Sequence, residues 1–223
     1  IAEDEGPMAA FNAILGLIEY HVPKLARLDT QVTHSGKTGL DIHVRFSQGP
    51  GVSGGSEGAR KATLTIFLGG EPAAVERARP VLERLGTTLT HFGPVGSGQA
   101  VKAVNQVMIS GVYLAVAEGV VLAMKAGLDP DQVVAALGGG VAGSWILANR
   151  SAKMVKNEYP LGFRTSLHLK DLGIALAMAR ELGVALPVTG LAAQLESGLV
   201  ARGFGDEDMS NLARPIRELS GLG

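Results

Sequence analysis

A lysine and two amides at the start of a long apolar segment form the densest group of polar side chains in the sequence. Lys102, Asn105 and Gln106 are three and four residues apart, so a helix would place them on one face, with Gly98 one turn earlier leaving space for a ligand. We expect such a lysine to be partly buried, which favours proton exchange near neutral pH and suits general acid–base chemistry. The alternative is a solvated lysine on the first turns of a core helix.

A second candidate lies in a glycine-rich segment, Val52 to Gly58, which contains Ser53, Gly54 and Gly55. Consecutive glycines after a strand expose backbone N–H groups, and together with a serine hydroxyl these groups can hold a carboxylate or a phosphate. Turns with two or three glycines are common, so a plain turn is the alternative interpretation.

A third candidate is a charged pair on an apolar stripe. Phe163, Leu167, Lys170 and Asp171 are spaced by four, seven and eight residues, which places them on one side of a helix together with Ile174. A cation and a carboxylate on such a face usually have a ligand or a partner, because burying unpaired charge is unfavourable. A solvated helix edge is the alternative.

The composition limits the class of protein. The 223 residues form one large domain or two small ones, and 46% hydrophobic against 18% charged residues excludes a disordered chain. The net charge of -1 provides no basic field for a phosphate backbone, so we expect no nucleic acid partner. Cysteine is absent, which excludes disulfides and thiolate metal sites and is compatible with a cytoplasmic location.

Two further patterns concern metals and membranes. None of the five histidines is spaced as a metal ligand, so we expect no metal site. The chain starts without a charged leader and apolar run, so we expect no signal peptide. Residues 107–124 are apolar enough to resemble a membrane span, but Glu118 and several small residues interrupt them. We therefore expect a buried core helix there and no membrane partner.

The pattern of elements changes near Pro94. Before it, from residue 41 to 92, an α/β pattern is expected: a strand at 44–46, a glycine-rich loop at 49–58, a strand at 63–68, a helix at 72–85 that Gly86 ends, and a strand at 87–91. In the first 40 residues we expect only a helix at 9–19 and a turn at 34–39.

From Pro94 onward, helical periodicity replaces the strand signals. We expect a helix at 97–126 that ends before Gly127, one that Asp129 caps and glycines 138–140 break, one that Ser144 caps, and further helices at 164–182, 187–202 and 211–219, the last disturbed by Pro215. The expected domains are residues 1–93 and 94–223.

Four segments resemble motifs of the β-hydroxyacid dehydrogenase family, which contains 3-hydroxyisobutyrate dehydrogenase and 2-hydroxy-3-oxopropionate (tartronate semialdehyde) reductase. Val52 to Gly55 is similar to the substrate loop and Gly96 to Gln106 to the catalytic-lysine motif. Gly138 to Ser144 resembles a segment typical of the tartronate semialdehyde branch, and residues 162–172 resemble the family's Phe…Lys-Asp-Leu helix. The four segments follow the family order.

The resemblance implies a fold of the α+β or α/β class, with a partial Rossmann-like N-terminal domain, a long interdomain helix and an all-α C-terminal domain. It also implies an oxidoreductase that uses NAD or NADP on a small semialdehyde or β-hydroxy acid, most closely a 2-hydroxy-3-oxopropionate reductase. A homodimer or a homotetramer is the implied assembly.

The resemblance further implies a role for each candidate residue. Lys102 would be the general acid/base that donates a proton to the aldehyde oxygen as hydride adds to the carbon, and Lys170 would reach the cofactor. The remaining residues would bind substrate: Ser53, Gly54 and Gly55 its carboxylate, Asn105 or Gln106 its reacting oxygen, and Phe163 and Asp171 as the lining of the pocket.

The sequence also departs from the family pattern. The family's dinucleotide fingerprint, a G-x-G-x-x-G turn between a strand and a helix, is missing from the expected elements. Only Gly6 to Ala10 is similar to its tail, and Gln106 stands where many relatives carry Asn. We therefore expect an incomplete or divergent nucleotide-binding domain. The alternatives are a non-catalytic helical oligomerisation module, or a family member acting on 3-hydroxyisobutyrate, glyoxylate or succinic semialdehyde.

Overall fold

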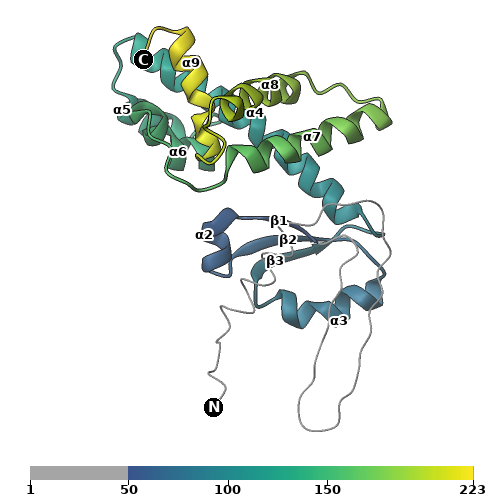
Figure 1. Ribbon diagram of the computed structural model, residues 1–223. Coiled ribbons are helices and arrows are strands. Elements are labelled where there is room, and N and C mark those ends of the chain that lie inside the picture. Colours follow the sequence, from purple (N-terminus) through teal and green to yellow (C-terminus); the bar gives the residue numbers. More distant parts are fainter. Residues whose placement is uncertain (1–49, 223) are drawn as a thin grey trace, which may run out of the picture. The chain divides into compact units, whose positions relative to one another are not determined.

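The structure is a computed structural model that describes residues 50–222 (Figure 1). The strand expected at 44–46 and the helix expected at 9–19 lie outside the described residues. The chain divides into two compact units. Unit 1 holds the described residues up to Ser53 together with Ala62–Ala100, and unit 2 holds Gly54–Lys61 and the residues from Val101 onward.

Unit 1 contains a three-stranded sheet in the order β1-β2-β3, with bounds Gly51–Ser53, Leu64–Leu68 and Gly86–His91. β1 is antiparallel to β2, pairing Ser53 with Thr65, and β2 is parallel to β3. Every second residue of β2 is buried, as its alternation of Leu64, Ile66 and Leu68 requires. The strands expected at 63–68 and 87–91 are therefore confirmed within one residue.

Helix α3 (Pro72–Leu82) connects β2 to β3 and buries Val75, Ala78 and Leu82. It ends three residues before the predicted end, and it contains Pro80 in its last turn. The expectation that Gly86 ends this helix is wrong, because Gly86 is the first residue of β3. A Cβ at Gly86 would collide with the carbonyl oxygen of Leu64, so the close approach of the two strands requires glycine.

The segment 49–58 is not the loop that its glycines predict. It contains β1 and a short helix, α2 (Gly55–Arg60), separated only by Gly54. Pairing of Gly51–Ser53 with β2 supplies the backbone hydrogen bonds of this stretch. Tertiary pairing therefore overrides the local preference of glycine for turns.

Unit 2 is helical. Helix α4 (Ser97–Lys125) begins in unit 1 and continues into unit 2, where the other helices are α5 (Pro130–Gly138), α6 (Trp145–Lys156), α7 (Thr165–Leu182), α8 (Pro187–Ala201), the 3-10 helix η1 (Met209–Leu212) and α9 (Ala213–Leu219). Between residues 94 and 222 the strand-type pairing described is a single isolated bridge, so the helical second half is confirmed.

The predicted helix caps are confirmed where they are local. The Asp129 carboxylate accepts hydrogen bonds from the amides of Asp131 and Gln132, and the Ser144 hydroxyl accepts one from Leu147. Pro215 does not disturb the last helix, because α9 begins at residue 213 and a proline in the first turn removes an amide that has no helical partner.

The core of unit 2 forms around α4, which contributes Tyr113, Leu114, Val116, Ala117 and Val120 to the buried cluster. By length and composition α4 could also cross a membrane, and 44% of its most apolar window is buried. A core helix of a globular domain passes the same test, so the finding is only weak evidence for a membrane span.

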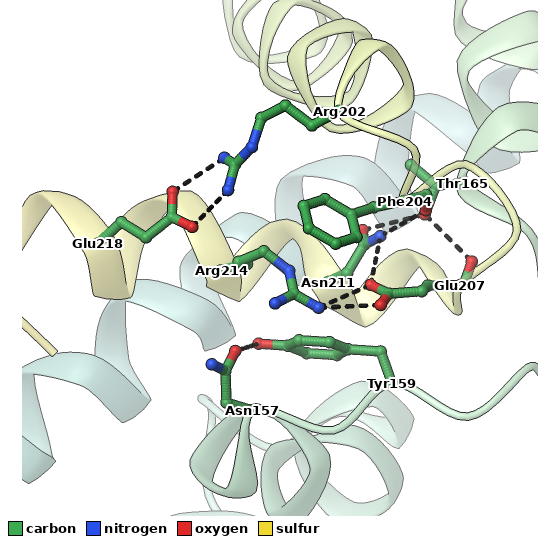
Figure 2. Close-up of polar contacts among 9 residues, drawn as sticks. All are labelled: Asn157, Tyr159, Thr165, Arg202, Phe204, Glu207, Asn211, Arg214 and Glu218. Carbon is green, nitrogen blue, oxygen red and sulfur yellow. Dashed lines mark hydrogen bonds and ion pairs between the residues drawn. The ribbon is translucent and has the colours of Figure 1, made fainter. Parts of the chain in front are cut away.

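A second set of contacts fixes the C-terminal helices of unit 2 (Figure 2). The Arg214 guanidinium lies 4.1 Å from the ring of Phe204 and 5.1 Å from that of Tyr159, and it donates to both carboxylate oxygens of Glu207 at 2.9 Å. Burial raises the pKa of Tyr159 to about 12, so its hydroxyl stays protonated and donates to Asn157. Stacking and ion pairing together hold α9 against the end of α6.

The same set of contacts fixes the start of α7. The single hydrogen of the Thr165 hydroxyl is shared between Asn211 Oδ1 at 2.9 Å and the carbonyl oxygen of Glu207 at 3.2 Å. On the other side of the set, Arg202 and Glu218 form a bidentate ion pair between α8 and α9. The first turn of α7 is therefore tied to residues some 40 positions later in the chain.

Helices α7 and α8 are joined by a buried pair, His168 and Glu196. His168 Nδ1 lies 2.6 Å from Glu196 Oε1, and both side chains are fully buried. Burial raises the pKa of Glu196, and the hydrogen bond from His168 offsets this only in part.

Gly98 allows the first turn of α4 to contact β2. An added Cβ would collide with the Phe67 carbonyl oxygen, so the strand fills the space that the sequence analysis expects to be left for a ligand.

We expect Gly98→Ala to destabilise the protein by about 1–3 kcal/mol through this collision. Gly119→Ala on the same helix meets no atom within 4 Å, and we expect it to gain about 0.5–1 kcal/mol from helix propensity. Urea unfolding of both variants and the unmodified chain tests this: the midpoint should fall for Gly98→Ala and rise for Gly119→Ala. An unchanged midpoint for Gly98→Ala would contradict the close contact between Gly98 and β2.

The buried pair predicts a pH-dependent stability. Because the Glu196 carboxyl binds a proton more tightly in the folded than in the unfolded chain, the stability that it contributes is present at low pH and is lost as the pH rises through its folded-state pKa. Glu196→Gln should therefore become more stable relative to the unmodified chain as the pH rises, by up to about 1.4 kcal/mol per pH unit. Thermal unfolding between pH 4.5 and 8 tests this, and a constant difference across the range would refute it.

Candidate functional site

The structure brings together the two polar groups that the sequence analysis considered separately. Lys102, Asn105 and Gln106 lie on the second and third turns of α4, and Lys170 and Asp171 lie on α7. All five belong to unit 2. The helical periodicity of α4 directs Lys102 and Gln106, four residues apart, to the same side.

Asp171 is the residue that joins the two helices. Its side chain is 7% exposed, and its Oδ2 accepts a hydrogen bond from Gln106 Nε2 at 2.7 Å. Lys102 Nζ lies 3.9 Å from the same oxygen, while Lys170 Nζ lies 3.1 Å from Oδ1. Both carboxylate oxygens are thus engaged by the protein.

The two lysines differ in their relation to this carboxylate. Lys170 is within hydrogen-bond distance of Asp171, and 43% of its side chain is exposed. Lys102 is 26% exposed and lies beyond hydrogen-bond distance, although two unit charges about 4 Å apart attract by roughly 4 kcal/mol near a protein surface, before desolvation is counted. The Lys102 ammonium is therefore attracted by the Asp171 carboxylate without being hydrogen-bonded to it.

The two amides of α4 are linked to each other. Asn105 Nδ2 donates to Gln106 Oε1 at 3.2 Å, and Gln106 is 4% exposed whereas Asn105 is partly exposed. Of the two amides that the resemblance associates with the reacting oxygen, Asn105 is the more accessible.

Phe163 lies just before α7 and packs against the buried cluster. Its ring lies edge-on to His168, with centroids 6.1 Å apart. Its backbone amide donates to Asp208 Oδ2 at 3.0 Å, and Arg150 lies 3.2 Å from the other oxygen of that carboxylate. The role of Phe163 in lining a pocket stays a prediction.

Asp208 is a positioning residue that our sequence analysis missed. It is fully buried, it holds the chain at Phe163, and its carboxylate also accepts from the amide and hydroxyl of Ser210. The signal was present, since aspartate is a preferred N-cap residue and Asp208 caps η1 by accepting from the Ser210 amide.

Ser53, Gly54 and Gly55 lie at the junction of β1 and α2. Gly54 has φ 131°, a conformation that side chains disfavour, so the chain leaves the strand and enters the helix through glycine. Ser53 belongs to unit 1 and Lys102 to unit 2, and their meeting in one site stays a prediction. Within the described part of the chain, no three His, Asp or Glu residues form a group that could hold a metal ion.

Comparison with known protein families matches both parts of the chain. The family described as NAD-binding of NADP-dependent 3-hydroxyisobutyrate dehydrogenase matches residues 96–216, which include the whole Lys102–Asp171 cluster. The NAD binding domain of 6-phosphogluconate dehydrogenase matches residues 40–93, which include Ser53, Gly54 and Gly55.

Individual relatives agree with the family match. The 2-hydroxy-3-oxopropionate reductase of Escherichia coli is 41% identical over 165 residues, covering 74% of this chain and 56% of its own length. The 2-(hydroxymethyl)glutarate dehydrogenase of Eubacterium barkeri is 36% identical over 172 residues, covering 77% and 57%. The chain thus spans little more than half the length of these relatives.

Solved structures share the fold. The 3-hydroxyisobutyrate dehydrogenase of Mycobacterium tuberculosis, determined with L-serine, has a TM-score of 0.69 and 32% identity, covering 75% of this chain and 60% of its own. This structural match and the family matches confirm the expected combination of a partial Rossmann-like domain, a long helix and an all-α domain. One family model matches more than half of the sequence and one relative is 41% identical over 74% of the chain, so the chain belongs to the β-hydroxyacid dehydrogenase family.

Proposed function

We propose that the protein is an NAD(P)-dependent oxidoreductase that reduces a small 2-hydroxy-3-oxo acid or a related semialdehyde, and oxidises the matching hydroxy acid in reverse. The observation that carries the proposal is the partly exposed Lys102 ammonium beside the buried Asp171 carboxylate. The 41% identity to a 2-hydroxy-3-oxopropionate reductase supports this substrate class.

Lys102 is the general acid/base in this proposal. When hydride adds to the aldehyde carbon, negative charge develops on the oxygen, and the Lys102 ammonium donates a proton to it. In the reverse direction the neutral amine removes the hydroxyl proton. Its 26% exposure and its distance from Asp171 support the role, because the amine can reach both a bound substrate and solvent.

The other candidate residues bind and orient. Ser53, Gly54 and Gly55 hold the substrate carboxylate through backbone amides and a hydroxyl, and Asn105 orients the reacting oxygen. Phe163 and Asp171 line the pocket, and the charge of Asp171 acts on the two lysines beside it. The family match to residues 40–93 and 96–216 supports both halves of this assignment.

Lys170 is the described residue best suited to hold the cofactor. Its side chain is 43% exposed and its ammonium is fixed at one side by Asp171, so it fits an anionic group of a dinucleotide. The nicotinamide ring supplies or accepts the hydride when the cofactor is bound. The choice between NAD and NADP is decided by titrating both.

Lys102→Ala tests the central role. We expect turnover to fall by about 10²–10⁴-fold while the fold and the affinity for NADH or NADPH persist, because only the proton donor is lost. Lys125→Ala, at the exposed end of the same helix, is the matched control and should retain full turnover. Retained turnover in Lys102→Ala would refute the role.

Binding and turnover together separate this proposal from its alternatives. A non-catalytic helical module predicts no saturable NADH or NADPH binding. If turnover is fastest on 3-hydroxyisobutyrate, glyoxylate or succinic semialdehyde, the family assignment stands and the substrate assignment changes.

We also propose that the protein is a homo-oligomer located in the cytoplasm. Val104, Met108 and Leu122 are exposed apolar residues on one side of α4, with exposures of 49%, 67% and 70%, and the exposed Glu118 lies on the same side. Covering them in a second copy would remove this surface from water. We expect a dimeric or tetrameric mass by light scattering and a smaller mass for Met108→Glu; a monomeric mass for the unmodified chain would contradict the proposal.

A further inference from the structure

Gln106 has both ends of its side chain engaged by the protein. Its Nε2 donates to Asp171 at 2.7 Å, its Oε1 accepts from Asn105 at 3.2 Å, and it is 4% exposed. The orientation of the amide is dictated by its partners, because the opposite orientation would place two acceptor oxygens against each other. Each end of the Gln106 amide therefore already has a partner within the protein, and only 4% of the residue is exposed to a substrate.

The Asp171 carboxylate oxygen that accepts from Gln106 is also the one nearest to Lys102. Asp171 Oδ2 lies 2.7 Å from Gln106 Nε2 and 3.9 Å from Lys102 Nζ. A carboxylate oxygen so nearly buried needs a hydrogen-bond donor, and the amide meets that need. With the amide in place, the ammonium is attracted to the carboxylate without being bonded to it.

We propose that Gln106 is a positioning residue: by donating to Asp171 Oδ2 it takes the acceptor position that Lys102 would otherwise use, and so keeps Lys102 from closing into a direct hydrogen-bonded ion pair. The inference rests on the proposed function for its catalytic consequence, but the geometry concerns this chain alone. Gln106 acts through Asp171, and the substrate contact falls to other residues such as Asn105.

Removing the amide should let the pair close. In Gln106→Met, which keeps an unbranched side chain of similar size, Asp171 Oδ2 loses its donor, and moving Lys102 Nζ about 1 Å would restore one. A lysine bonded in this way loses nucleophilicity, because its lone pair is protonated and its protons are engaged. In an Asp171→Asn background no carboxylate remains to close on, so the same substitution should have no such effect.

The test measures the reactivity of Lys102 directly in the 223-residue chain. Each variant is treated with trace acetic anhydride at a fixed pH of about 8, and the acetylation of Lys102 is read by mass spectrometry relative to the exposed Lys125 on the same helix. We expect Gln106→Met to lower the relative labelling of Lys102 at least threefold. Gln194→Met, an exposed glutamine on α8, is the matched control and should leave labelling unchanged.

The double variant decides the route of the effect. If Gln106 acts through Asp171, adding Gln106→Met to Asp171→Asn leaves Lys102 labelling as it is in Asp171→Asn alone. An equal loss in both backgrounds, or unchanged labelling in Gln106→Met, would overturn the proposal. If Gln106→Met fails the check of its circular dichroism and thermal unfolding, Gln106→Asn carries the same expectation, because its amide is one methylene too short to reach Asp171.

Turnover is a separate readout. Where the unmodified protein turns over, Gln106→Met should lower kcat with little change in the substrate KM, whereas a substrate-orienting role would raise KM. Absence of turnover in the unmodified protein would count against the proposed function. The labelling of Lys102 would then still decide whether Gln106 has the proposed positioning role.

Discussion

The buried carboxylate of Asp171 is the constraint on which the candidate site depends. A charged group with 7% of its side chain exposed must be surrounded by donors, because an unpaired buried charge is strongly unfavourable. The donors come from two helices, Gln106 on α4 and Lys170 on α7, so satisfying one side chain fixes the relation of both helices. Lys102 is placed as a consequence of this arrangement.

The rest of unit 2 can be understood as support for α7. Its first turn is tied to η1 and to the loop before it through Thr165, the chain just ahead of it is held by Asp208, and its middle is joined to α8 by His168 and Glu196. These contacts hold a helix rather than a loop, and a rigid helix fixes a side chain more closely than a loop does. Most of the buried polar groups of the unit therefore serve the element that carries Asp171.

The sequence predicted what local chemistry determines. Caps at Asp129 and Ser144 and the alternation of β2 follow from neighbouring residues, and the structure confirms them. What it could not predict depends on distant partners. The segment at 51–60 pairs with β2 despite its glycines, and Gln106 meets a carboxylate 65 positions away. The Lys102 and Asp171 groups were each identified, but the spacing along one helix carries no information on the distance to another.

The arrangement around Asp171 has an electrostatic consequence at long range. Two ammonium groups, Lys102 and Lys170, share one carboxylate, so this region of a chain with a net charge of -1 carries a local excess of positive charge. Anionic molecules are drawn toward such a region before any contact forms, and dissolved salt screens the attraction over about 10 Å at 0.1 M. An encounter between this region and a small anion is therefore sensitive to ionic strength.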